Sequence, residues 1–318
     1  MSDNKIKLVS VAGPTASGKT SLSVSLAMRF GAEIVSADSM QIYKGMNIAT
    51  AKPSKDEMCS IPHHLMDYVD VDETYSVARY IEDANSAIND IMSRGKLPMV
   101  VGGTGLYMDS LLSGITYCEG DVDLKLRANL QDKLSRIGID AMLAELADFD
   151  PDSAQRLSTE RNPKRIIRAM EVYYTTGITM TEQNLRSKEK ESPYNPTKIA
   201  LNFHDRQKLY DRINRRVDIM LEQGLVKEAE AYFSANPGNT AVQAIGYKEL
   251  RPYFDGELSL DECVEILKRS TRRYAKRQLT WFMRDPQIKW FYADDFNDSD
   301  ELFRVVSDYL IQEGFEAK

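Results

Sequence analysis

The sequence predicts an α/β protein: a P-loop parallel-sheet core with an all-helical insertion domain. Two observations support this prediction. In the first third of the chain, short apolar runs alternate with longer amphipathic runs, which is typical of strands and helices in a parallel, doubly wound sheet. From about Asp121 to Ser192 the sequence changes to charged, amphipathic helical patterns. A chain of 318 residues has room for a main domain and a second one.

The first predicted strand, residues 8–12, leads into a glycine-rich loop and then into a helix over residues 21–30. Residues 13–20 read GPTASGKT and fill every fixed position of the G-x-x-x-x-G-K-[ST] motif. Glycines let the backbone approach a phosphate closely, and N–H groups at the positive end of the helix face its oxygens. Lys19 adds a positive charge, and the Thr20 hydroxyl is placed to reach Mg²⁺. The loop therefore predicts binding of a diphosphate or a triphosphate.

Two more predicted strands lead towards the same rim as this loop. Residues 32–37 form the second strand, which is followed by Asp38. After a helix over residues 77–93, residues 97–101 form a buried strand that runs into a glycine-rich turn containing Thr104. Ligands of open α/β sheets bind beyond the carboxyl ends of the strands. We therefore expect the phosphate loop, Asp38 and Thr104 to lie on one rim of the sheet.

The predicted insertion consists of charged amphipathic helices. The first two extend over residues 124–147 and 151–158. A third is opened by Asn162 and Pro163, a favourable pair for the start of a helix, and is stopped by Gly177. This pattern predicts a helical domain inserted into the core rather than a continuation of the sheet.

The polar stretch 186–197 contains two prolines and is expected to return the chain to the core, where residues 198–203 form a further strand. Helices over residues 209–223 and 226–233 follow, and then a basic segment. The predicted domains are residues 1–120 (first part of the core), 121–197 (helical insertion) and 198–318 (second part of the core with C-terminal basic helices).

Composition and cysteine spacing exclude several classes of protein. No apolar stretch approaches the roughly 20 residues that span a membrane. The first residues show no signal-peptide pattern, so we expect a cytoplasmic protein that does not bind membranes. The three cysteines are widely separated and form no C-x-x-C pair, which predicts neither a disulfide framework nor a zinc site.

The charge of the chain is uneven. A formal net charge of −7 argues against a nucleic-acid partner when taken alone. Residues 268–284, however, contain seven Lys or Arg residues and no acid. Such a segment predicts either a solvated helix face or a local surface for phosphate groups.

The residues near the loop leave more than one chemistry open. A phosphate loop alone is most often found in nucleotide kinases, ATPases and GTPases, and no Asn-Lys-x-Asp element supports guanine binding. Asp38, directly after a strand, fits a Mg²⁺ ligand. Because Ser39 and Gln41 follow it, Asp38 also fits a general base next to an amide that reads a nucleobase edge.

Ordered sequence blocks across nearly the whole chain resemble the tRNA dimethylallyltransferases, also called tRNA isopentenyltransferases, of the IPP transferase family. Members of this family modify the adenosine next to the anticodon. Eukaryotic relatives carry an added zinc finger, for which no Cys/His spacing is present here, so the resemblance is to the bacterial type. The matching blocks are residues 13–20, 36–43, 45–53, 62–65, 102–107, 162–169, 244–249 and 276–282.

The resemblance implies transfer of a dimethylallyl group from dimethylallyl diphosphate to N6 of adenosine 37, which gives N6-isopentenyladenosine. It implies that Asp38 is the base that takes the N6 proton, that Thr104 hydrogen-bonds near the reacting amine, and that Gln41 reads the adenine. It also implies Mg²⁺ as the cofactor, held at Thr20. The implied diphosphate-binding residues are Gly13, Thr15, Ala16, Ser17, Gly18, Lys19, Thr20 and Arg212.

The implied partner is the anticodon stem-loop of tRNA, bound by a protein that we expect to be a monomer. Adenosine inside a stacked loop cannot be reached, so we expect it to be flipped into a channel between core and insertion. Some relatives have Gln at the position of Lys164, so a phosphate contact is expected there. The implied tRNA-binding residues are Asp38, Ser39, Met40, Gln41, Thr104, Arg127, Lys164, Arg165, Arg168, Gln243, Gly246, Tyr247, Lys248, Arg269, Arg272, Arg273, Lys276 and Arg277.

Three other functions use the same loop. In a nucleotide-dependent small-molecule kinase, Asp38 would activate a hydroxyl group, and ATP would be consumed without tRNA. An isopentenyltransferase acting on free adenine nucleotides would need the loop and the base but no basic helix. A non-catalytic RNA-binding P-loop protein would tolerate loss of Asp38.

Overall fold

The computed structural model describes residues 5–115, 123–187, 191–235, 237–238 and 241–318. The chain forms two compact units. The first combines Met1–Leu112 with Pro193–Lys318, and the second is Ser113–Ser192. The second unit is thus an insertion in the first, and all strands of the described chain belong to the first unit.

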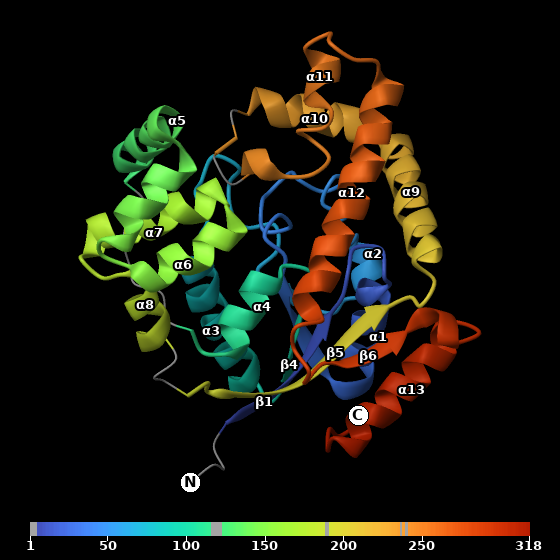
Figure 1. Ribbon diagram of the computed structural model, residues 1–318. Helices are drawn as coiled ribbons and strands as arrows, with labels where there is room; N and C mark the ends of the chain where they lie inside the picture. Colours follow the sequence, from blue (N-terminus) through green and yellow to red (C-terminus); the bar gives the residue numbers. More distant parts are fainter. Residues whose placement is uncertain (1–4, 116–122, 188–190, 236, 239–240) are drawn as a thin grey trace. The chain divides into compact units, whose positions relative to one another are not determined.

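The first unit is built on a parallel sheet of six strands in the order β3-β2-β4-β1-β5-β6 (Figure 1). The three strands predicted in the first third of the chain are present, as β1, β2 and β4. Because β1 has β4 on one side and β5 on the other, the loop after β1 lies where a crevice forms in such sheets. The strands are β1 Ile6–Ala12, β2 Ala32–Ala37, β3 His63–His64, β4 Leu97–Gly102, β5 Tyr194–Asn202 and β6 Lys289–Tyr292.

Two helices cover one face of the sheet. They are α1 (Lys19–Phe30) and α13 (Ser299–Gln312), and Val306 of α13 belongs to the same apolar cluster as Val9 and Val11 of β1. Helix α1 ends at Gly31 with a positive φ of 61°, as expected for a glycine stop. Successive side chains of β1 lie on opposite faces of the sheet, so one set packs on this face and the other set packs on the opposite face.

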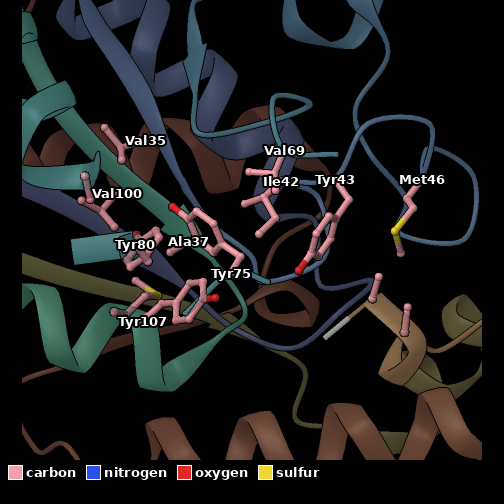
Figure 2. Packing of buried hydrophobic residues seen from close by; sticks show 14 of the residues in the cluster. Val35, Ala37, Ile42, Tyr43, Met46, Val69, Tyr75, Tyr80, Val100 and Tyr107 are labelled. Carbon is pink, nitrogen blue, oxygen red and sulfur yellow. The ribbon is translucent and has the colours of Figure 1, made fainter. Parts of the chain in front are cut away.

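The opposite face carries the larger apolar cluster, to which four helices and, in addition, α10 (Leu225–Ser234) contribute. Figure 2 shows how Val35 and Val100 of the strands lie near the aromatic rings of Tyr80 and Tyr107. These two rings stack with their centroids 4.2 Å apart. The helices are α3 Val77–Ser93, α4 Gly105–Leu112, α9 Arg206–Glu222 and α12 Leu260–Phe282.

Strand β5 differs from its prediction. It begins at Tyr194, not at residue 198, so the predicted domain boundary at 197/198 falls inside the strand. Pro196 within this stretch favoured a loop in the sequence. β6 pairs only with residues 199–202 of β5, so Pro196 faces no neighbour on that side, where a residue without an N–H is tolerated. The predicted boundary at 120/121 lies outside the described residues.

The second unit contains only helices in its described part: α5 Leu124–Ala147, α6 Pro151–Glu160, α7 Pro163–Thr176 and α8 Met180–Arg186. Asn162 caps α7 by accepting a hydrogen bond from the Lys164 N–H. The predicted helix over 124–147 is interrupted at Gly138, which has a positive φ of 79°. Leu130, Met142 and Leu157 belong to a separate apolar core in this unit.

Some elements had no counterpart in the sequence prediction. They include β3, formed by His63 and His64, and β6 with α13 at the C-terminal end. No helix in the described ranges is long and apolar enough to cross a membrane. The remaining elements are α2 Lys55–Met58, η1 Ala241–Gln243, α11 Arg251–Phe254 and η2 Ala293–Asp295.

Candidate active site

A cavity of about 250 Å³ opens in the first unit at the carboxyl ends of β1, β2 and β4. Its wall includes Lys19 and Thr20 of the phosphate loop, Asp38 after β2, and Gly103 after β4. The structure therefore brings three separate sequence predictions to one place. Other predicted residues in the wall are Thr15, Ser39, Met40, Gln41, Gln243, Gly246, Lys248 and Arg277.

The phosphate loop has the shape of an anion cradle. Gly13, Ala16 and Gly18 all have positive φ angles, of 136°, 64° and 99°. At Gly13 a side chain is excluded, because a Cβ there would lie 2.5 Å from the Leu201 carbonyl oxygen. The buried Ser17 Oγ has no hydrogen-bond partner among the described residues. A bound phosphate would satisfy this hydroxyl, so the residues present fit the predicted ligand.

Two arginines of α9 reach this loop. The Arg212 Nε donates a hydrogen bond of 2.8 Å to the Ala16 carbonyl, which places its positive charge beside the loop. Arg216 lies in the cavity wall, with its Nη1 3.5 Å from the Thr15 Oγ1. Arg216 was not predicted from the sequence. Its position four residues after Arg212, on the same helix face, is the signal that points to it.

Charge repulsion and burial act together on Lys19. Its Nζ donates a hydrogen bond of 2.7 Å to the Pro14 carbonyl within the same loop. Burial and then the positive charge of Arg216 lower the pKa of Lys19 to about 7, against an opposing effect of Asp38. Lys19 and Arg216 repel each other here, and the negative charge of a diphosphate would offset that repulsion.

Asp38 is held in place by the turn that follows β2. Its Oδ1 accepts hydrogen bonds from the N–H groups of Met40 (2.9 Å) and Gln41 (3.3 Å). Within the described residues no group donates to its Oδ2. Burial raises the pKa of the carboxyl above its ordinary value, although these N–H groups and Lys19 act in the opposite direction. A carboxylate with a raised pKa and one free oxygen is suited to accept a proton.

Thr104 and Gln41 are both held by neighbouring backbone. The Thr104 Oγ1 accepts a hydrogen bond of 3.0 Å from the Ser39 N–H, and Thr104 is not among the residues that line the cavity. The Gln41 Nε2 donates to the carbonyls of Thr50 (3.0 Å) and Ala51 (3.2 Å). Its Oε1 is therefore the atom left for a ligand, as a hydrogen-bond acceptor.

Gln278 of α12 connects the phosphate loop to the turn that follows β4. Its Oε1 accepts a hydrogen bond of 2.9 Å from the Thr15 N–H, and its Nε2 donates one of 3.0 Å to the Gly103 carbonyl. A side chain at position 103 would displace this amide, because a Cβ there would lie 2.2 Å from the Nε2. The sequence contains Gln278 in one of the family blocks, but no local pattern indicated this connection.

The predicted RNA-binding residues of α12 divide into two groups. Arg272 is half-buried and donates a hydrogen bond of 2.5 Å to the Asn214 Oδ1. The others are exposed, and within the described residues none of them forms an ion pair. Their spacing of four, seven and eight residues places them on one helix face. These exposed cations are Arg269, Arg273, Lys276 and Arg277.

Tyr247 requires a correction. Its side chain is fully buried, its ring stacks on Tyr232 at 4.0 Å, and its hydroxyl donates a hydrogen bond to Glu228. The predicted contact of this side chain with RNA is not available in such a position. The neighbouring Gly246 and Lys248 line the cavity as described above.

The predicted cations of the second unit lie on α5 and α7. Arg127 donates to the buried Glu171, at 2.5 and 2.9 Å, and Arg168 lies 3.7 Å from the same carboxylate. Arg165 is paired with Glu160. Lys164 is exposed, and no ion pair of its ammonium group is seen in the described part of the chain. Among these residues Lys164 therefore carries the charge most available to a phosphate.

The side chains around the phosphate loop offer few ligands for a metal ion. The described residues contain no group of three or more His, Cys, Asp or Glu side chains that could hold one. Thr20 lines the cavity. Mg²⁺ commonly binds through one or two protein ligands together with phosphate oxygens and waters, so the Thr20 hydroxyl fits such a site.

Comparisons with known proteins agree with this geometry. Residues 41–285 match the family model described as IPP transferase. The chain is 44% identical to a tRNA dimethylallyltransferase of Thermoanaerobacter sp. (strain X514) over 308 residues, covering 96% of this chain and 98% of the relative. It is 47% identical to that of Bacillus subtilis (strain 168) over 292 residues, or 92% of each chain.

Solved structures are similar over the same length. A tRNA isopentenylpyrophosphate transferase from Bacillus halodurans is 41% identical, with a TM-score of 0.72, covering 97% of this chain and 96% of that one. A eukaryotic dimethylallyltransferase described as acting on tRNA is 31% identical, with a TM-score of 0.78, covering 96% of this chain and 80% of that one.

Proposed function

The chain belongs to the IPP transferase family, and we propose that it transfers a dimethylallyl group from dimethylallyl diphosphate to N6 of adenosine 37 in tRNA. The observation that carries this proposal is that Asp38, which follows β2, lines the same cavity as Lys19 of the phosphate loop. A base and a diphosphate cradle are the two groups that an alkylation of an amine by an allylic diphosphate requires. The product is N6-isopentenyladenosine next to the anticodon, and pyrophosphate is released.

The reaction breaks the bond between C1 of the allyl group and the diphosphate oxygen, and the bonding electrons leave with pyrophosphate. Negative charge therefore grows on the loop side of the cavity. Lys19 and Arg216 in the wall, and Arg212 beside Ala16, stabilise that charge. Mg²⁺ bound at Thr20 would add a further positive charge there. The allylic carbon gains carbocation character as the bond lengthens.

The adenine N6 lone pair forms the new bond to C1, and one N6 proton must then leave. This amine is a poor nucleophile because its lone pair is delocalised into the ring. Asp38 is the group that accepts the proton, through the Oδ2 that the turn leaves free. Its raised pKa makes this transfer more favourable than it would be to an ordinary aspartate.

The rest of the wall suits an allylic substrate. Apolar side chains in the wall give the prenyl group a dry surface, which limits capture of the carbocation by water. Gln41 offers its Oε1 as an acceptor for an amine hydrogen of the base. The apolar wall residues are Val101, Ile213, Val217, Met220, Ile245 and Leu267.

We also propose that one chain is sufficient for the reaction and that it works in the cytoplasm, where tRNA is found. The base Asp38 and the loop residue Lys19, which the reaction requires, both belong to the first unit of this chain. The anticodon stem-loop would be recognised by exposed cations of α12 and of the second unit.

The test is incubation of the purified protein with Mg²⁺, radiolabelled dimethylallyl diphosphate and unmodified tRNA, with ATP in a parallel reaction. We expect label in tRNA that carries adenosine 37 and none in the same tRNA with guanosine 37. ATP consumption without transfer to tRNA would instead indicate a kinase.

The variant Asp38→Asn tests the role of the base, because it keeps the shape of the side chain but removes the carboxylate. We expect kcat to fall by about 10²- to 10⁴-fold with the affinity for dimethylallyl diphosphate nearly unchanged. Single-turnover transfer and equilibrium binding measure the two quantities. If diphosphate affinity falls with kcat, Asp38 is a metal ligand and not the base.

A further inference from the structure

The cavity wall next to Gln41 is a short loop. Ala49, Thr50 and Ala51 line the cavity, and the carbonyls of Thr50 and Ala51 hold the Gln41 amide. We call residues 47–51 the amide-holding loop. Its conformation is tight: Ala51 has a positive φ of 51° and donates from its N–H to the Ile48 carbonyl at 2.9 Å. The placement of Gln41 therefore depends on what fixes this loop.

One carboxylate from a distant part of the chain binds the start of this loop. Glu228 of α10 accepts hydrogen bonds from three consecutive backbone N–H groups, those of Asn47 (3.0 Å), Ile48 (2.8 Å) and Ala49 (2.9 Å). Consecutive N–H groups of this kind form a concave site for an anion. Hydrogen bonds to a charged acceptor are stronger than those to a neutral one, so Glu228 is a firm anchor.

The same carboxylate also fixes an adjoining segment of the cavity wall. The Tyr247 hydroxyl donates a hydrogen bond of 2.8 Å to the Glu228 Oε1, and its neighbours Gly246 and Lys248 line the cavity. Gly246 packs directly on the amide-holding loop, since a Cβ there would lie 2.7 Å from the Ala49 Cβ. Glu228 therefore holds two wall segments, which are distant in sequence, in one arrangement.

The segment just before the loop is fixed in a different way. Ile42, Tyr43 and Met46 are buried in the apolar cluster that Figure 2 shows, where Val69 lies beside Ile42. Burial of these side chains anchors residues 42–46 whether or not Glu228 is present. Loss of Glu228 is therefore expected to release the amide-holding loop and leave the core intact.

We propose that Glu228 is a positioning residue for adenine recognition: through the N–H groups of residues 47–49 it sets the loop whose carbonyls orient the Gln41 side chain. This inference rests on the proposed function, because it assigns the reading of adenine to Gln41. Glu228 itself does not line the cavity, so it is placed to act through the loop.

The test compares Glu228→Gln with Glu230→Gln, an exposed glutamate on the same helix. Glutamine keeps the shape of Glu228 but has no negative charge, and its NH₂ group faces N–H donors. We expect Glu228→Gln to lower kcat/KM for tRNA about 10- to 100-fold, the size of effect that small misplacements produce. The affinity for dimethylallyl diphosphate and the melting temperature are expected to match those of Glu230→Gln.

A double-mutant cycle with Gln41→Ala separates positioning from a general structural role. If Glu228 acts through Gln41, the double variant Gln41→Ala/Glu228→Gln will be no slower than Gln41→Ala alone. Additive losses, or a Glu228→Gln variant as active as Glu230→Gln, would overturn the proposal. Tyr247→Phe, which removes one donor to the same carboxylate, is expected to give a smaller loss in the same direction.

The wild-type protein in the same assay keeps the two proposals apart. If it transfers no prenyl group to tRNA, the proposed function fails. If it transfers the group and only the Glu228 comparison shows no difference, the proposed function stands and the positioning role of Glu228 fails.

Discussion

At the scale of single residues, the site consists of charged groups whose properties come from neighbours distant in sequence. Lys19 and Arg216 are 197 residues apart in the numbering, yet the arginine lowers the pKa of the lysine. Both side chains are largely shielded from water, and this shielding strengthens their interaction with an anion. The two positive charges repel each other, and a bound diphosphate would relieve this repulsion.

Arg216→Ala tests this view of the loop. We expect the affinity for dimethylallyl diphosphate to fall by about 10- to 100-fold, the usual range for a charge-assisted contact to phosphate. Arg215→Ala is the matched control, because Arg215 is the exposed neighbour and does not line the cavity. Isothermal titration with the diphosphate measures both. Equal affinities for the two variants would show that Arg216 does not bind the ligand.

At the scale of secondary-structure elements, β2 is held at both ends. Its carboxyl end carries Asp38, and near its amino end Glu33 accepts hydrogen bonds from Arg94, at the end of α3, and contacts His64 of β3 at 2.8 Å. The hydrogen bond from Arg94, more than any other contact, lowers the pKa of Glu33 to about 2. This cluster joins a central strand to an edge strand and a helix.

Glu33→Gln is expected to lower the free energy of unfolding by about 1–3 kcal/mol at pH 7, because the buried side chain no longer accepts charge-assisted hydrogen bonds from Arg94. The pKa of Glu33 is lower in the folded chain than the ordinary 4.5, so its ionised form stabilises the fold above about pH 4.5. That contribution is lost as the pH falls towards 2. Urea unfolding should therefore show a smaller difference between wild type and variant at pH 3 than at pH 7, and a constant difference would contradict this account.

Helix α12 has separate faces for the site and for solvent. Gln278 and the apolar residues face inward, whereas Arg269 and Arg273 are exposed. We expect Arg269→Ala/Arg273→Ala to raise KM for tRNA. The slope of log K against log[salt] should become shallower by about one for each RNA phosphate that these arginines neutralise.

The control for this double variant is Lys96→Ala/Arg304→Ala, which removes the same charge from exposed positions outside α12. Filter binding over a range of salt concentrations provides the slopes. Identical slopes for the two double variants would mean that α12 does not contact the RNA backbone.

At the scale of the whole molecule, the two units have separate cores and separate expected tasks. The first unit contains every residue that lines the cavity, and the second has its own apolar core around Leu146 and Ile166. Binding of dimethylallyl diphosphate should therefore not depend on the packing of the second unit.

Leu146→Ala tests this division. It creates a cavity among fully buried side chains and is expected to destabilise the second unit by about 2–5 kcal/mol. We expect unchanged affinity for dimethylallyl diphosphate and a raised KM for tRNA. Leu26→Ala in α1 of the first unit is the contrasting variant, and it is expected to weaken diphosphate binding as well. Weakened diphosphate binding in Leu146→Ala would contradict independent units.

Local sequence determined the elements that depend on neighbouring residues. Gly31 and Asn162 mark helix boundaries because a positive φ or a side-chain cap acts within one turn. The phosphate loop could be predicted for the same reason, since its N–H groups, glycines and lysine lie within eight residues. The strand ends and the residues that follow them indicated Asp38, Thr104 and Gln41 as candidates, and the family resemblance supplied their roles, but neither gave the contacts between them.

Tertiary structure decided everything that requires residues far apart in the chain to meet. The start of β5 was predicted four residues too late in the sequence. Pairing with β1 outweighs the local preference of Pro196 for a loop. The burial of Tyr247 and the reach of Glu228 and Gln278 to distant loops leave no local pattern, and the only local signal for Arg216 is its spacing of four residues from Arg212. The sequence by itself thus determined the fold class and the kind of ligand, whose signals are short-range. Packing of distant segments determined how the site is positioned and charged, because burial and hydrogen bonding act through space and not along the chain.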